Sequence, residues 1–280
     1  MSVISTNISA TLAANALAKN ERSMTISMER LSTGQRINTA KDDAAGLAIS
    51  LRMSGQIRGL EQAARNANDG ISMVQTVEGA SKEIMNMLVR MRELAVQAAS
   101  ETYSDDDRDA LDLEYQALEA EITRIATATQ WNASNRMDLA ANADDFDVQI
   151  GANASQTMSL EFLSWDVADA ANTAYGVDMT GDSLQSAANA NTAIGNLDTA
   201  INGAAAEQAK YGSYISRLQH ASDNLMNVAQ NTAASRSRIA DADYAKETTE
   251  LARTQIIAQA GTAMLAQANQ VKQTVLALLQ

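Results

Sequence analysis

The feature that most constrains this chain is an apolar residue at every seventh position from residue 257 to the end. The stripe consists of Ile257, Met264, Val271 and Leu278, with Gly261, Ala268 and Val275 between them. An alternation of four and three residues is typical of a helix that packs along another helix. Ile256 and Leu265 lie beside the stripe, so one neighbouring helix would not cover the apolar surface. The sequence therefore predicts a helix that needs several neighbours.

A transmembrane helix is the alternative for this segment, and its amide side chains argue against it. The amides are Gln255, Gln259, Gln267, Asn269, Gln270, Gln273 and Gln280. Each would carry unsatisfied polar groups into lipid, at a cost of several kcal/mol. A helical assembly that is partly hydrated accepts such side chains, so we do not expect a membrane partner.

The rest of the chain also predicts long helices, because its 280 residues include no proline. Heptad frames run through residues 3–31, 49–98 and 194–239, and a further helical pattern covers residues 111–125. Gly34 suits the left-handed position that ends a helix, and Asp42 or Asp43 suits the start of the next one. Ser104 followed by Asp107 is typical of a capping box.

A short stretch near the middle alternates with period two instead. Phe146, Val148 and Ile150 alternate with polar or small residues, and Met158, Leu160 and Phe162 repeat the pattern after a short polar segment. Two such runs predict a β-hairpin. Residues 131–143 are rich in turn formers, and residues 164–182 are irregular, small and acidic.

The predicted fold class is mostly α, a long coiled-coil-like helical rod with one small β-hairpin and with its N- and C-terminal helices paired. We expect residues 1–42 and 240–280 to form the N- and C-terminal helical segments of an inner core domain. Residues 43–182, with two helices and the hairpin, and residues 183–239 would form the two parts of a rod domain.

Composition and charge exclude several classes of function. The net charge of −13 disfavours nucleic acid and anionic membranes as partners. The chain has no cysteine and a single histidine, which leaves no thiolate or histidine cluster for a metal. It shows no nucleophile–base pairing and no phosphate loop. We therefore expect no enzyme, no metal and no cofactor, and the residues before Lys19 do not resemble a Sec-type signal peptide.

Several segments together make the chain resemble the bacterial flagellins. They are Leu31-Ser32-Thr33-Gly34 with Arg36-Ile37-Asn38, residues 41–49, 65–72 and 92–97, Val148-Gln149-Ile150-Gly151-Ala152-Asn153, residues 237–244 and residues 259–269. The large variable outer domains of many flagellins are missing. The resemblance therefore implies a minimal flagellin that has only the two inner domains.

This resemblance implies a structural subunit that polymerises into the flagellar filament, outside the cell, after secretion through the flagellum's own channel. It also implies an export chaperone on the C-terminal helix, a filament cap and hook–filament junction proteins as partners. The alternatives are a flagellar hook-associated or junction protein and a coiled-coil adhesin rod.

The heptad stripes at the two ends are the predicted polymerisation core. Its residues are Val3, Ala10, Leu17, Met24, Leu31, Ile257, Met264, Val271, Val275 and Leu278. A lone pair of helices returns too little buried area to offset the entropy of ordering both ends. We therefore expect the ends to order when copies assemble.

Four further positions follow from the resemblance alone. Arg90, Leu94, Gln97 and Glu114 match positions that the flagellin-sensing toll-like receptor of animals reads in family members that it detects. The plainer interpretation is that Arg90 and Glu114 are ordinary exposed charges and that Leu94 packs along the filament.

Overall fold

The computed structural model describes residues 7–137, 146–167 and 181–277, with side chains described as far as residue 270. Within these ranges the chain forms five helices and two short antiparallel strand pairs. The helices are α1 (Ile8–Thr33), α2 (Ala44–Ala98), α3 (Asp105–Ala128), α4 (Ala187–Ala240) and α5 (Tyr244–Ala277). The strands are β1 (Gln130–Trp131), β2 (Ser134–Asn135), β3 (Phe146–Gln149) and β4 (Thr157–Leu160). The predicted fold class is confirmed.

The chain divides into two compact units. The terminal unit comprises Met1–Ile57 and Gln230–Gln280, and the central unit comprises Arg58–Ala229. The domain boundaries predicted at residues 42/43 and 239/240 fall inside the terminal unit, and that four-part division stays a prediction.

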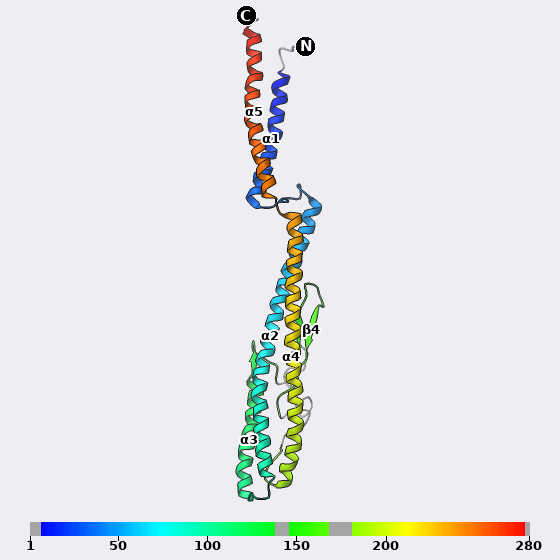
Figure 1. Cartoon of the computed structure of the whole chain (residues 1–280), viewed down its shortest axis with the longest axis vertical. Helices are drawn as coiled ribbons and strands as arrows, with labels where there is room; N and C mark the ends of the chain where they lie inside the picture. Colours follow the sequence, from blue (N-terminus) through cyan, green and yellow to red (C-terminus); the bar gives the residue numbers. More distant parts are fainter. Residues whose placement is uncertain (1–6, 138–145, 168–180, 278–280) are drawn as a thin grey trace. The chain divides into compact units, whose positions relative to one another are not determined.

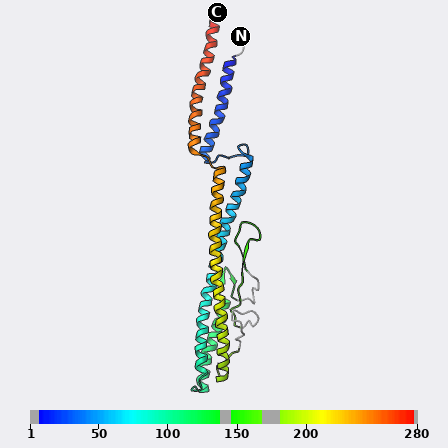
Figure 2. The same cartoon turned by 45° about the vertical axis from the view of Figure 1, so that its right-hand side comes forward.

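In the central unit, α2, α3 and α4 lie side by side (Figures 1 and 2). The heptad stripe predicted along α2 is buried from Val74 to Ala98, and Ile84, Leu88 and Met91 have no exposed surface. Tyr115 of α3 and Leu197 of α4 meet them in one continuous core. Large side chains at heptad spacing therefore give this unit a dry interior of its own.

Helix α3 starts at the predicted capping box. The Ser104 hydroxyl accepts a hydrogen bond from the Asp107 backbone N–H at 3.3 Å, and the Asp107 carboxylate accepts one from the Ser104 N–H at 3.0 Å. Hydrogen bonds from the Ser104 side chain and backbone lower the pKa of Asp107. The charged carboxylate also lies at the positive end of the helix dipole, where it is favourable.

Strands β3 and β4 form the predicted hairpin, with Phe146 opposite Leu160 and Val148 opposite Met158. Val148, Met158 and Leu160 are buried, as the alternation predicted. Gly151 is required in the connecting loop, because a Cβ at this position would lie 2.6 Å from the Cβ of Gln156.

The short β1–β2 pair was not predicted. Its two turn residues, Asn132 and Ala133, have φ of 48° and 61°. Two consecutive positive φ values are typical of a type I′ hairpin turn, which normally has glycine at the second position. Ala133 does not give that signal, so the sequence predicts only a turn-rich segment at residues 131–143.

In the terminal unit, α1 and α5 lie side by side and antiparallel (Figures 1 and 2). Gly34 ends α1 in the left-handed conformation, with φ of 70°, as predicted. The connections that follow are tied together, because the Arg36 N–H donates to the Ala240 carbonyl at 2.7 Å and the Ala242 N–H donates to the Gly34 carbonyl at 2.9 Å.

The start of α2 distinguishes the two candidate caps. The Asp43 carboxylate accepts a hydrogen bond from the Gly46 N–H at 2.9 Å, so Asp43 holds the N-cap position. Asp42 instead accepts hydrogen bonds from the N–H groups of Asn38 and Thr39. These bonds, the one from the Thr39 backbone above all, lower the pKa of Asp42.

Candidate polymerisation surface

The contact between α1 and α5 is polar where it is most deeply buried. The residues of these helices that are buried, among side chains 7–270, are Asn20, Ser27, Glu247 and Thr254. The Asn20 side-chain amide donates to the Thr254 carbonyl at 2.7 Å, and Arg30 pairs with Glu247 at 2.9 Å. No large apolar side chain within that part of the pair is fully buried.

Smaller and half-buried side chains complete this seam. On α1 the half-buried heptad residues are Ala10, Leu17, Met24 and Leu31, all four of which belong to the predicted polymerisation core. On α5 the half-buried apolar and glycine positions are Leu251, Ala258, Gly261, Leu265 and Ala268. Leu17 packs onto Gly261, because a Cβ added to Gly261 would lie 3.4 Å from the Leu17 Cδ1 atom.

The two predicted α5 residues with described side chains lie outside this seam. Ile257 is 42% exposed and Met264 is 65% exposed. The predicted stripe and the observed seam share Gly261 and Ala268. At the positions between them the stripe has Ile257 and Met264, whereas the seam has the next residue in each case, Ala258 and Leu265. The side chains of Val271 and Val275, together with Val3 and Leu278, lie outside the described residues.

Large apolar side chains gather on the outward faces of the pair. Their members are Ile8, Leu12, Ile26, Met28, Tyr244, Ile256, Ile257 and Met264, which we call the outward apolar set. Ile8, Leu12 and Ile256 are each about two-thirds exposed and are absent from the predicted core. The sequence carried a signal for them, because each is an apolar residue beside a heptad stripe. Exposed apolar side chains on both helices make this pair the candidate interaction surface.

The four receptor positions do not form one exposed patch. Arg90 and Glu114 are exposed and bonded, with the Arg90 Nε donating to Glu114 at 3.0 Å and its Nη1 donating to Glu93 at 3.0 Å. These bonds, first to Glu93 and then to Glu114, raise the pKa of Arg90. Gln97 is exposed and donates to the Tyr103 hydroxyl at 3.2 Å, whereas Leu94 is 1% exposed in the core.

A transmembrane helix is the alternative for the C-terminal segment. Across residues 7–137, 146–167 and 181–277, no helix combines the length and the apolar character that crossing a bilayer requires.

Two family descriptions match most of the chain. Residues 4–140 match the bacterial flagellin N-terminal helical region, and residues 194–279 match the bacterial flagellin C-terminal helical region. The two matches cover the helices that form both the polar seam and the core of the central unit.

Known proteins resemble the chain over nearly its whole length. A flagellin of Halalkalibacterium halodurans is 44% identical over 253 residues, which is 90% of each chain. The flagellar filament 33 kDa core protein of Treponema phagedenis is 40% identical over 99% of this chain and 100% of its own. The crystal structure of Bacillus cereus flagellin is 35% identical, covers 61% of this chain and 94% of that chain, and superposes with a TM-score of 0.50.

The comparisons agree with an architecture of long N- and C-terminal helices. They also favour the flagellins over the hook-associated and adhesin alternatives. The chain therefore belongs to the bacterial flagellin family and is a structural subunit of the flagellar filament.

Proposed function

We propose that the chain polymerises through α1 and α5, and that these helices become stably ordered only when neighbouring copies cover the outward apolar set. The observation that carries this proposal is the burial pattern of the pair. Among its described side chains only Asn20, Ser27, Glu247 and Thr254 are buried, while the outward apolar set is exposed. Flagellins are structural proteins, so by family the chain is not an enzyme.

The energetics of the pair support ordering on assembly. Fixing the backbone costs about 1–2 kcal/mol per residue, and burial of apolar surface is the main term that offsets this cost. The seam buries polar groups, whose net contribution to stability is only about 1 kcal/mol per hydrogen bond. Burial of Leu12, Ile256 and Met264 against other copies would supply the missing apolar contribution.

Further partners follow from family membership. The chain would be secreted through the flagellar channel and would reside in the extracellular filament. An export chaperone would cover the C-terminal helix before assembly, which the exposed apolar residues of α5 support. A filament cap and the hook–filament junction proteins would contact the ends of the polymer.

Hydrogen exchange on the monomer tests ordering on assembly. In dilute monomer, amides of residues 245–270 should exchange close to the rate of an unfolded chain, whereas those of residues 77–98 should be strongly protected. After polymerisation both segments should be protected. Equal protection of the two segments in the monomer would refute the proposal.

A second candidate activity is recognition by the flagellin-sensing toll-like receptor of animals. Exposure of Arg90, Gln97 and Glu114 supports it, while burial of Leu94 restricts direct contact to the other three. Arg90→Glu should weaken receptor signalling by soluble protein, with Arg92→Glu as the matched control on the same helix. Equal potency of the Arg90→Glu variant and the unmodified chain would exclude this role.

A further inference from the structure

We propose that a hollow beside Trp131 in the central unit binds an arginine side chain of a second copy of this chain. The proposal rests on the polymerisation proposed above and names one contact within it. The hollow has a volume of about 310 Å³ and lies between α2 and β3.

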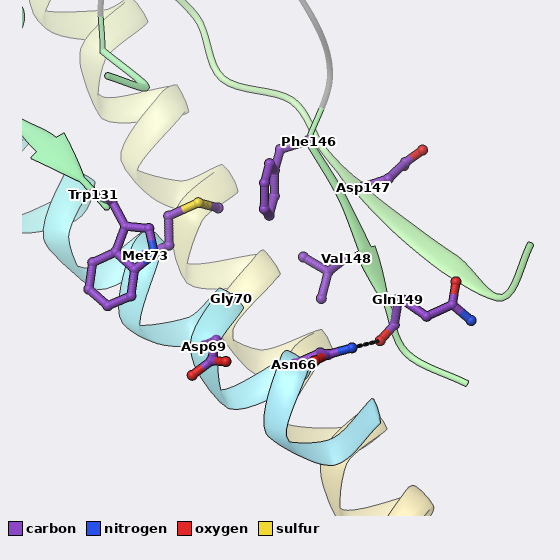
Figure 3. Close-up of a pocket in the computed structure, with 9 residues that line it drawn as sticks. All are labelled: Asn66, Asp69, Gly70, Met73, Trp131, Phe146, Asp147, Val148 and Gln149. Atoms are coloured by element: carbon purple, nitrogen blue, oxygen red, sulfur yellow. Dashed lines mark hydrogen bonds between the residues drawn. The ribbon is translucent and has the colours of Figure 1, made fainter. Parts of the chain in front are cut away.

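The side chains around the hollow form a slot with aromatic walls (Figure 3). The Trp131 ring lies on one side, Phe146 and Val148 lie on the other, and Met73 lies between them. An adjoining hollow of about 540 Å³ is lined by Asp69, Trp131 and Asn132. Trp131 is 37% exposed and borders both hollows, so a ligand can reach its ring from either one.

The chemistry of the slot favours a cation. Asp69 is exposed beside Trp131 and forms no ion pair with another side chain in the described part of the chain. The hollow lined by Phe146 contains two aspartates, Asp69 and Asp147, and no basic residue. An aromatic face attracts a cation through its negative quadrupole, and a nearby carboxylate adds a hydrogen-bonding partner of opposite charge.

The protein already makes one contact of this kind at the same place. The guanidinium carbon of Arg136 lies 4.8 Å from the centre of the Phe146 ring. Arg136 does not line the hollow, which leaves the slot between the two rings open. A planar guanidinium stacks on aromatic rings and bonds to a carboxylate in two places, which an ammonium group cannot do. We therefore assign the site to arginine and not to lysine.

The backbone beside the slot is strained. Ala133 holds φ of 61°, a conformation that costs a residue with a side chain about 1–2 kcal/mol. The turn is tied to the end of α3, because the Asn135 side-chain amide donates to the Ala126 carbonyl at 2.8 Å. A strained turn that persists at a binding site is a common way to fix the position of a contact residue.

Charge complementarity identifies the occupant as another copy. The chain has 34 acidic and 21 basic side chains, so an acidic site on one copy is best matched by a basic side chain of another. Four exposed arginines make no ion pair or side-chain hydrogen bond within the described residues, and they are Arg22, Arg52, Arg58 and Arg217. Each is free to enter the slot of a neighbour.

The test measures the critical concentration for seeded polymerisation of the full chain. Trp131→Ala should raise it about tenfold, the change expected from losing about 1.4 kcal/mol of cation–π attraction. Trp131→Leu, which keeps apolar area but loses the quadrupole, should raise it similarly. Asp69→Asn should raise it about threefold. Glu61→Gln is the matched control, because this exposed carboxylate lies on the same helix as Asp69 and lines neither hollow.

A charge reversal identifies the arginine. Asp69→Arg should block assembly. A second substitution to aspartate is then added at one of the four arginines, Arg22, Arg52, Arg58 or Arg217. Assembly should return for the one arginine that enters the slot. Thermal unfolding of each variant checks that the central unit remains folded. The proposal would be overturned if the Trp131→Ala or Trp131→Leu variant had the same critical concentration as the unmodified chain. It would also be overturned if none of the four arginine reversals restored assembly. Failure of the unmodified chain to polymerise would instead count against the proposed function.

Discussion

The central unit and the α1/α5 pair share the heptad period but bury different kinds of side chain. In the central unit, the heptad positions of α2 hold large side chains such as Ile84, Leu88 and Met91, and these are fully buried within one copy. In the α1/α5 pair, the buried positions hold polar residues such as Asn20 and Ser27, larger seam residues such as Leu17 and Leu265 are only half-buried, and the outward apolar set is exposed. The heptad period thus shows only that helices pack. The depth of burial distinguishes a core that one chain completes from a pair of helices that one chain leaves partly uncovered.

Removal of Thr254–Gln280 should have the largest effect on this contrast. The truncated chain loses Ile256, Ile257 and Met264 from the outward apolar set and should form no filaments, while the central unit should keep its thermal midpoint. Electron microscopy of concentrated protein and a calorimetric melt measure the two outcomes. Normal filaments from the truncated chain would show that the terminal pair does not drive assembly.

A matched pair of truncations to alanine should separate the two roles. Leu88→Ala removes a fully buried side chain and should cost the central unit about 2–5 kcal/mol of unfolding free energy. Met264→Ala removes a side chain that is 65% exposed and should leave monomer stability within about 0.5 kcal/mol while weakening polymerisation. Chemical denaturation and critical concentrations measure these effects. If Met264→Ala destabilised the monomer as strongly as Leu88→Ala, the distinction between the regions would fail.

The smallest expected effect concerns Glu207, a buried acid in the core of the central unit. Burial raises its pKa, against the opposing attraction of Lys210 at 3.6 Å. An acid whose folded pKa is raised stabilises the fold below its unfolded pKa, and this contribution is lost as the pH rises through the folded value. Glu207→Gln should therefore lose less stability than the unmodified chain as the pH rises above about 4.5.

Glu161→Gln is the control for this prediction, because that exposed carboxylate shares Lys210 without being buried. Acids such as Asp107 and Asp198 have lowered pKa values and the opposite pH dependence, but they are common to all the variants compared. Parallel curves of melting temperature against pH for Glu207→Gln and the unmodified chain would contradict the expectation.

Local signals predicted much of this architecture. The left-handed cap at Gly34, the capping box at Ser104 and the β3–β4 alternation each depend on a few neighbouring residues, and each is confirmed. The missed β1–β2 turn is also local, but Ala133 occupies a position where glycine is the usual signal. Helix ends and hairpins can thus be predicted where residue types match backbone geometry closely.

The sequence predicts less well the features that depend on contacts between distant segments of the chain. Two heptad registers of α5 share Gly261 and Ala268. Only packing against α1 distinguishes them, because it leaves Leu265 half-buried and Met264 exposed. Burial of Leu94 likewise depends on its packing in the three-helix core. The slot beside Trp131 requires β1 and β3 to meet α2, which no local pattern in the sequence encodes.

The hydrogen bond from Asn20 to the Thr254 carbonyl has a consequence for the accuracy of a growing fibre. If α1 slid along α5 by one turn, this amide would lose its acceptor in a place that water does not reach, at a cost of about 1–3 kcal/mol. One axial alignment is therefore preferred in every molecule, and Leu12 and Ile256 are presented at the same heights each time. Identical subunits can then add one after another without accumulating errors of position.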